Sequence, residues 1–151
     1  MASVFDVAQY ILHKSGRLTT WKLQKLCYYS QAWSLVWDEK PLFNEEIEAW
    51  ANGPVIPDLY KRHKGRFYVT DRNIAGEPSK ITKRQRDTID AILDSYGKKS
   101  SSWLSELTHG ELPWENARKR DNLSCGERGN AEIKLDEMAE YYGGIYAEQK
   151  K

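Results

Sequence analysis

Apolar positions recur with the period of an α-helix through most of the chain. After Ser3, a residue suited to capping a helix, apolar side chains return every three or four positions as far as Leu12, and Gly16 can end the helix in a left-handed conformation. Residues 20–37 are apolar around most of the helical circumference, which is typical of a helix buried on most sides. We therefore expect this segment to form the centre of the fold.

Start and stop signals predict further helices downstream. Pro57 stands at a favourable first helical position, and Gly65 follows the end of the same segment. Thr82 and Gln85 have the spacing of a capping box. The predicted later helices cover 57–63, 83–96, 103–109, 113–119 and 135–149.

Two short segments have the character of strands instead. Residues 46–50 alternate between polar and apolar side chains, and the sequence Asn52-Gly53-Pro54 breaks the alternation. Residues 66–70 form a second short stretch of this type. The two segments are expected to pair as a small two-stranded sheet at one edge of the fold.

These elements predict an α+β fold that is predominantly α-helical. Helices near 3–14, 83–96 and 135–149 are expected to pack around the central helix 20–37. Residues 121–131 are predicted to be loop. No repeat, low-complexity tract or linker divides the sequence, so residues 1–151 are interpreted as a single domain.

Composition narrows the class of protein without identifying it. The 151 residues are 40% hydrophobic and 30% charged, with a net charge of +1, values typical of a globular domain with no general attraction for polyanions. Cys27 and Cys125 are far apart and are interpreted as free thiols in a reducing compartment. The sequence begins without a basic signal-peptide region and has no apolar run of about 18 residues. We expect a soluble, cytoplasmic protein that does not enter membranes.

Residue patterns that support catalysis are missing from the sequence. His13, His63 and His109 are scattered, and no Cys-x-x-Cys pair accompanies them. His109-Gly-Glu111 matches the H-x-E of zinc deaminases but lacks the Pro-Cys-x-x-Cys that would supply their remaining ligands. There is no nucleophile elbow and no phosphate-binding loop. We therefore predict no catalytic residues, no metal, no cofactor and no enzymatic activity.

Nucleic-acid binding is a second function class to consider. A basic cluster is interleaved with aromatic side chains, a combination that can contact phosphates and stack on bases. Its members are Tyr60, Lys61, Arg62, Lys64, Arg66, Phe67 and Tyr68. Because no RNA-binding signature is present and the overall charge is balanced, this remains the alternative to protein binding.

Aromatic content favours protein binding. The chain has six tryptophans and nine tyrosines against three phenylalanines. Tryptophan and tyrosine combine a large apolar area with one polar group, which suits interfaces. Trp50 directly precedes a segment with two prolines, 51–57, and a ring on a rigid turn loses little entropy when it docks.

Three ordered blocks of sequence resemble the SocA-like antitoxins, whose shared module is also called the Panacea domain. Residues 22–33, KLQKLCYYSQAW, resemble that family's KLQKLLYYAQ-x-W helix, with Cys27 in place of the usual leucine. Residues 41–60 resemble its PLF…IEAW-x-x-GPV-x-P-x-LY run, and residues 104–114 its L-x-x-x-TH-x-x-x-PW segment. The blocks lie within residues 20–118 and follow one another in the family's order.

This resemblance implies a component of a bacterial or phage toxin–antitoxin system, such as those found in prophages. Members of the family generally neutralise a toxin encoded beside them by binding it directly. One member acts instead as an adaptor that delivers its toxin to the ClpXP protease, so a ClpX-type protease is a further candidate partner. A nucleic-acid-binding regulator of a phage or mobile element is the remaining alternative.

The candidate partner-binding surface follows from the resemblance and from the rigid turn. Its residues are Trp50, Asn52, Gly53, Pro54, Val55, Tyr60, His109 and Trp114. Each has an alternative explanation within the fold. Gly53 and Pro54 would then only shape the turn, Trp50 and Trp114 would belong to the core, and His109 would cap its own helix.

Overall fold

The computed structural model describes residues 1–150. Its α-helices are α1 (Val4–Ser15), α2 (Thr20–Trp37), α3 (Pro57–His63), α4 (Lys83–Tyr96), α5 (Ser101–His109), α6 (Leu112–Arg120) and α7 (Leu135–Gln149). The strands are β1 (Leu18–Thr19), β2 (Glu48–Trp50), β3 (Gly53–Val55), β4 (Tyr68–Val69) and β5 (Ala131–Glu132), and a short 3-10 helix, η1, covers Pro78–Lys80.

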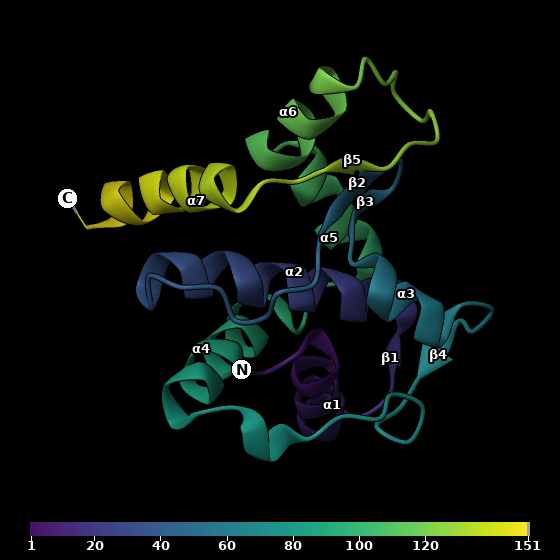
Figure 1. Ribbon diagram of the computed structural model, residues 1–151, viewed down its shortest axis with the longest axis vertical. Helices are drawn as coiled ribbons and strands as arrows, with labels where there is room; N and C mark the ends of the chain where they lie inside the picture. The colour runs from purple at the N-terminus through teal and green to yellow at the C-terminus, as the bar shows by residue number, and fades with distance from the viewer. Residues whose placement is uncertain (151) are drawn as a thin grey trace.

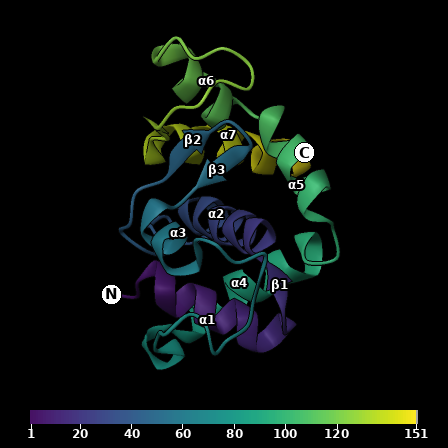
Figure 2. The ribbon, with the colours of Figure 1, turned by 90° about the vertical axis from the view of Figure 1, so that its right-hand side faces the viewer.

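Helix α2 lies between two layers of helices. Figure 1 shows α7 on one side of α2 and α1 with α4 on the other, and all three helices pack against α2. Figure 2 shows that the β2–β3 hairpin lies on the α7 side, close to one end of α2. The core of α2 is closed to solvent: Leu23, Leu26, Tyr28 and Tyr29 are all 0% exposed. The predicted central helix and the predominantly helical α+β class are confirmed.

Local capping interactions set the helix starts. Ser3 and Asp6 form a reciprocal capping box on α1, and Thr82 and Gln85 form another on α4. The Thr19 side chain accepts a hydrogen bond from the amide of Lys22 at the start of α2. The predicted helices are confirmed, although α5 begins two residues earlier than predicted and α6 one residue earlier.

The predicted strand pairing is wrong. Segment 46–50 does not pair with 66–70; β2 instead turns back through Ala51 and Asn52 and pairs with β3, so that Trp50 lies opposite Gly53. A hairpin with a two-residue turn closes a much shorter loop than the predicted pairing would. Gly53 has φ +129°, a conformation that favours glycine. Pro54 has no amide proton to donate, but β3 is an edge strand and tolerates it.

The remaining strands also differ from the prediction. The segment predicted as loop, 121–131, ends in β5, which pairs with the other edge of β2. Strand β4 pairs with β1, directly before α2, so residues 66–70 belong to a separate two-stranded sheet. Residues 1–150 therefore form two small sheets, and β2 is the central strand of the larger one.

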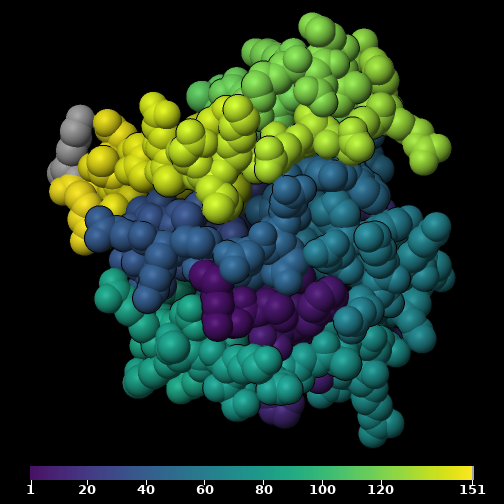
Figure 3. Space-filling model, viewed as in Figure 1, coloured from purple at the N-terminus to yellow at the C-terminus, as the bar shows by residue number. Residues whose placement is uncertain are grey.

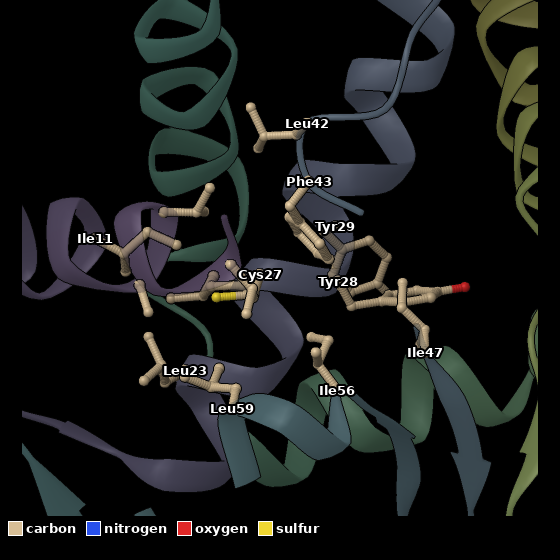
Figure 4. Packing of buried hydrophobic residues seen from close by; sticks show 14 of the residues in the cluster. Ile11, Leu23, Cys27, Tyr28, Tyr29, Leu42, Phe43, Ile47, Ile56 and Leu59 are labelled. Carbon is tan, nitrogen blue, oxygen red and sulfur yellow. The ribbon is translucent and has the colours of Figure 1, made fainter. Parts of the chain in front are cut away.

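Cys27 is enclosed by the apolar core. Its sulfur lies on the α2 face that meets α1, near Ile11, Leu23 and Leu59 (Figure 4), and its exposed fraction is 0%. Burial raises the pKa of the Cys27 thiol. The side chain therefore packs as a small apolar group and cannot meet a substrate from solvent.

Two buried glutamines of α2 fasten the chain segments that cross this helix. The amide group of Gln31 accepts from the backbone N–H of Leu42 at 2.6 Å and donates to the carbonyl of Phe43 at 2.8 Å. Gln24 accepts from the backbone N–H of Ile56 at 2.8 Å. Both side chains are 0% exposed. The two glutamines act as hydrogen-bond partners, in place of water, for backbone groups that would otherwise be buried without partners.

The N-terminal segment is held between later parts of the chain. Figure 3 shows it enclosed by residues of the long connection after α2 and of the segment around η1. The Val4 amide donates to the Glu45 carboxylate at 2.9 Å, and the Asp6 carboxylate accepts from the Glu77 amide at 2.7 Å. Within residues 1–150, none of the helices is both long enough and apolar enough to cross a bilayer.

Replacing Gln31 with leucine is expected to lower the free energy of unfolding by roughly 2–4 kcal/mol. The buried backbone groups of Leu42 and Phe43 would lose their hydrogen-bond partner, and water cannot reach them to take its place. Urea denaturation followed by circular dichroism measures the difference. The exposed Gln149→Leu is the control and should stay within about 0.5 kcal/mol of wild type. Equal losses for the two variants would contradict this role of Gln31.

Candidate functional site

The turn between β2 and β3, formed by Ala51 and Asn52, lies among three neighbouring hollows. The Arg128 hollow, about 370 Å³, is bordered by Trp21, Asn52 and Arg128. The Lys25 hollow, about 360 Å³, shares Trp21 and Asn52 with it. The Trp114 hollow, about 320 Å³, touches Ala51. We call this surface, the turn with its three hollows, the hairpin site.

Three separate parts of the sequence meet at this turn. His109 lines both the Lys25 hollow and the Trp114 hollow, and its ring lies against that of Trp114 with centroids 4.2 Å apart. The Trp114 Nε1 donates to the backbone carbonyl of Trp50 at 2.8 Å. Tyr60 packs against the Trp50 ring at 4.9 Å. The structure thus brings together the predicted aromatic residues and His109.

The other predicted residues differ sharply in exposure. The Asn52 side chain is exposed at the tip of the turn, whereas Gly53, Pro54 and Val55 are buried. A Cβ on Gly53 would come within 2.6 Å of the Lys25 Cε, so a larger residue cannot fit there without movement of Lys25. The three buried residues therefore position the turn, and Asn52 presents its surface.

Trp50 and Trp114 are half-buried, which places them between a core position and a free surface position. The Trp50 Nε1 donates to the Glu48 carboxylate at 2.9 Å, which fixes the ring beside its own strand. Trp114 packs against the hydrophobic core and Trp50 packs against Tyr60, and each ring also lines a hollow. Rings held in this way are rigid contact surfaces.

His109 is the last residue of α5, and Gly110 caps this helix. Within the described chain, its Nε2 atom is buried and has no hydrogen-bond partner. Burial lowers the pKa of His109, the charges of Lys25 and Arg118 lower it further, and the backbone of Ala51 opposes them only in part. The imidazole is therefore neutral at neutral pH.

Lys25 is the functional candidate that the sequence analysis missed. Its side chain is 1% exposed, yet it lines the Lys25 hollow, 5.4 Å from the centre of the Trp21 ring. Among residues 1–150, its ammonium group has neither a hydrogen-bond acceptor nor a carboxylate partner. Burial lowers the pKa of Lys25 to about 8, so the group still carries its charge at neutral pH. The available signal was a lysine on the same helical face as Trp21 and Tyr29, in a helix that is otherwise buried.

Arg118 is a second buried cation, but its hydrogen-bonding groups are satisfied. The guanidinium donates to the carbonyl of Ala49 in β2 at 2.9 Å and to that of Ser124 at 3.0 Å. It also lies over the Trp114 ring, 5.3 Å from the centroid. Arg118 thus fastens the segment before β5 to β2 and builds the wall of the Trp114 hollow.

Glu111 is tied into the core by hydrogen bonds. Its carboxylate accepts hydrogen bonds from the hydroxyl groups of Tyr29 at 2.7 Å and Tyr142 at 2.8 Å, which links α2, α6 and α7. Burial raises the pKa of Glu111, although the two tyrosine hydrogen bonds oppose this. Within residues 1–150, no three histidine, cysteine or acidic side chains gather as metal ligands would.

The basic and aromatic cluster lies apart from these contacts. Phe67 and Tyr68 are 65% and 46% exposed, and their rings meet edge to face at 4.8 Å. The Arg17 guanidinium lies 4.3 Å from the centre of the Tyr68 ring. Tyr60, in contrast, is half-buried between Trp21 and Trp50 and belongs to the hairpin site.

Comparisons with known proteins agree on one family. The family model described as "Antitoxin SocA-like, Panacea domain" matches residues 23–115, a range that includes Lys25, the β2–β3 hairpin, His109 and Trp114. A curated relative, the "Antitoxin SocA" of Caulobacter vibrioides (strain NA1000 / CB15N), is 31% identical over 125 residues. The alignment covers 72% of this chain and 66% of the relative, slightly less than two thirds of that protein's length. No solved structure matches the chain.

Lys25→Met is expected to raise the free energy of unfolding at pH 7 by about 3 kcal/mol, because it removes an unpaired charge from the interior. Below pH 8 the lysine is charged in the folded and unfolded states, and the fold bears the full cost of burial. Between about pH 8 and 10.5 the folded protein has lost a proton that the unfolded chain still holds, so wild-type stability rises and the difference from Lys25→Met closes. Denaturant unfolding across this pH range tests the effect, and parallel pH profiles for the two proteins would contradict it.

Proposed function

The chain belongs to the SocA-like antitoxin family with its Panacea domain, and from this premise we propose that it neutralises a cognate toxin by binding it directly through the hairpin site. One observation carries the proposal: segments from α2, the β2–β3 turn and the α5–α6 region meet at a single exposed turn bordered by three hollows. Such a surface offers concave sites for side chains of a partner and needs no chemical step.

The hairpin site is held in place by hydrogen bonds and contacts with neighbouring elements, which favours tight binding. The Ser105 hydroxyl donates to the carbonyl of Asn52, and the Trp114 indole donates to that of Trp50. Gly53 lies directly on the Lys25 side chain. A surface fixed by such contacts loses little conformational entropy when a partner docks, so more of the contact energy becomes affinity.

Half-buried aromatic side chains supply the anchors of the proposed interface. Trp21 and Trp50 both line the Arg128 hollow, and Trp114 lines the hollow named after it. Interface energy is concentrated in tryptophan, tyrosine and arginine side chains that lie in well-packed, desolvated pockets of the complex. A stable complex built on this site would bury about 800 Å² of this chain.

Nucleic-acid binding is the second candidate function, and a different surface supports it. Phe67 and Tyr68 expose their rings next to the basic residues that precede them, Lys64 and Arg66. Exposed rings beside cations can stack on unpaired bases. The two candidate functions therefore depend on different residues and can be tested separately.

Expression of each open reading frame next to this gene, with and without the protein, is expected to identify a toxic neighbour whose toxicity the protein suppresses. Asn52→Trp should abolish suppression and weaken toxin binding at least tenfold, since the new ring would obstruct two hollows at once. The matched control is Asn44→Trp, the same change at an exposed asparagine outside the site, and it should behave as wild type. Both variants should melt within a few degrees of wild type.

Three results would contradict direct neutralisation through the hairpin site. The first is that no neighbour is toxic, and the second is that Asn52→Trp and Asn44→Trp suppress toxicity equally well. The third is that the toxin disappears only in cells that contain a ClpX-type protease. The last result would favour the adaptor function. Toxin levels measured by immunoblot in strains with and without the protease distinguish it from stoichiometric binding.

The nucleic-acid candidate predicts retention on heparin and binding to single-stranded RNA or DNA that weakens steeply with salt. Phe67→Ala should then lower the affinity by about 1–3 kcal/mol through lost stacking, while toxin suppression stays at the wild-type level. Fluorescence anisotropy at several salt concentrations measures the affinity. Binding that is weak and indifferent to Phe67→Ala would remove this candidate.

A further inference from the structure

We propose that the Lys25 hollow binds a carboxylate carried by the partner toxin, so that the toxin segment crossing the β2–β3 turn is acidic. This inference rests on the proposed function and names the chemistry of the partner at that site. It follows from a buried cation that the fold encloses but does not pair.

The first step is the isolation of the Lys25 ammonium group. Its side chain is 1% exposed and contacts the position of Gly53, and no carboxylate of residues 1–150 forms an ion pair with it. A buried charge without a partner destabilises a fold, and an apolar side chain of similar size would suit the interior better. Because the lysine lines a hollow that opens to solvent, a carboxylate can reach it from outside.

The second step concerns the polar groups around the lysine. Ser102 and His109 line the same hollow, and the His109 Nε2 is the buried nitrogen without a partner. The Ser102 hydroxyl can donate to a bound oxygen while remaining uncharged, whereas the neutral His109 ring uses its one N–H on the Ala51 backbone and keeps Nε2 as an acceptor. The hollow runs along one side of α5, from Ser101 in its first turn to His109 at its end, so the helix supplies polar side chains along its whole length.

The third step is the choice between a carboxylate and a phosphate as the bound anion. The hollow offers one cation, and the exposed Glu106 carboxylate lies at its rim. A dianionic phosphate would meet this negative charge with only one lysine to offset it, and phosphate sites generally supply more cations or an arginine fork. A single negative charge matches a single lysine.

The fourth step indicates a polypeptide as the source of the carboxylate. The Lys25 hollow continues into the Arg128 hollow across Trp21 and Asn52, which border both. An extended segment that places one carboxylate on Lys25 would run over the Trp21 ring toward the exposed Arg128, where a second acidic residue would find a cation. A small free anion would use only the first of these hollows.

Lys25→Met tests the proposal with Lys22→Met as its matched control, because Lys22 is on the same helix but does not line the hollow. Toxin binding measured by calorimetry should weaken at least tenfold for Lys25→Met and less than twofold for Lys22→Met. The melting temperature of Lys25→Met should rise, which excludes unfolding as the cause. If Lys25→Met binds as wild type and still suppresses toxicity, the carboxylate site is refuted while the proposed function stands.

The partner provides the reciprocal test. Each exposed aspartate and glutamate of the toxin is changed to its amide, and each variant is measured against wild type and against Lys25→Met. One toxin carboxylate should lose as much affinity as Lys25→Met does, with little further loss when the two changes are combined. Additive losses for every carboxylate would overturn the pairing.

A third experiment needs no toxin and therefore tests the anion site independently of the proposed function. The Nζ resonances of the full chain are followed by NMR while acetate or inorganic phosphate is titrated at equal concentrations. Acetate should shift the Lys25 resonance and leave Lys22 unchanged. No shift at Lys25 would refute an anion site, and binding of phosphate at least tenfold tighter than acetate would refute a carboxylate site.

Discussion

Helix α2 has almost no side that faces water, and this constraint governs the rest of the structure. Every polar group on it must find a partner inside the protein or remain unpaired at a cost of a few kcal/mol. Gln24 and Gln31 meet the requirement by binding the backbone of the segments that cross the helix. The paths of the connection after α2 and of the β3–α3 junction are therefore fixed by two side chains. Lys25, next to Gln24, is the charged group on this helix that lacks such a partner, and the buried Ser30 hydroxyl lacks one as well.

The hairpin site is a consequence of this same helix. Gly53 lies directly against the Lys25 side chain, with no room for a Cβ between them. The distance between the β2–β3 turn and α2 is therefore set by the Lys25 side chain and by the absence of a Cβ at Gly53. Arg118 then joins β2 to the segment before β5, and Trp114 ties its indole to Trp50. The turn is rigid because Arg118 and Trp114 bind the backbone of β2 directly before it and Ser105 binds the carbonyl of Asn52. In this architecture the stability of the core and the shape of the surface are not independent.

The sequence predicted the helices well because periodicity and caps are local signals. Ser3 with Asp6 and Thr82 with Gln85 specify helix starts within four residues. The strands are two or three residues long, and their pairing depends on where the helices bring them, so the predicted pairing of 46–50 with 66–70 failed. Family-like blocks located Trp50, His109 and Trp114, but Lys25 was overlooked. A lysine within an apolar helix signals burial only when all sides of that helix are known to be covered.

The unpaired lysine also suggests how folding and partner binding are coupled in this protein. Below pH 8 the free domain carries a charge in its interior that lowers its stability. In the proposed complex, a carboxylate placed on that charge would remove part of the cost, so the complex would gain energy from this protein's own core as well as from new surface contacts. An isosteric apolar residue would give a more stable free domain and a weaker binder. Residues that compromise the fold in this way, while lining an open hollow, are where selection for function outweighs selection for stability.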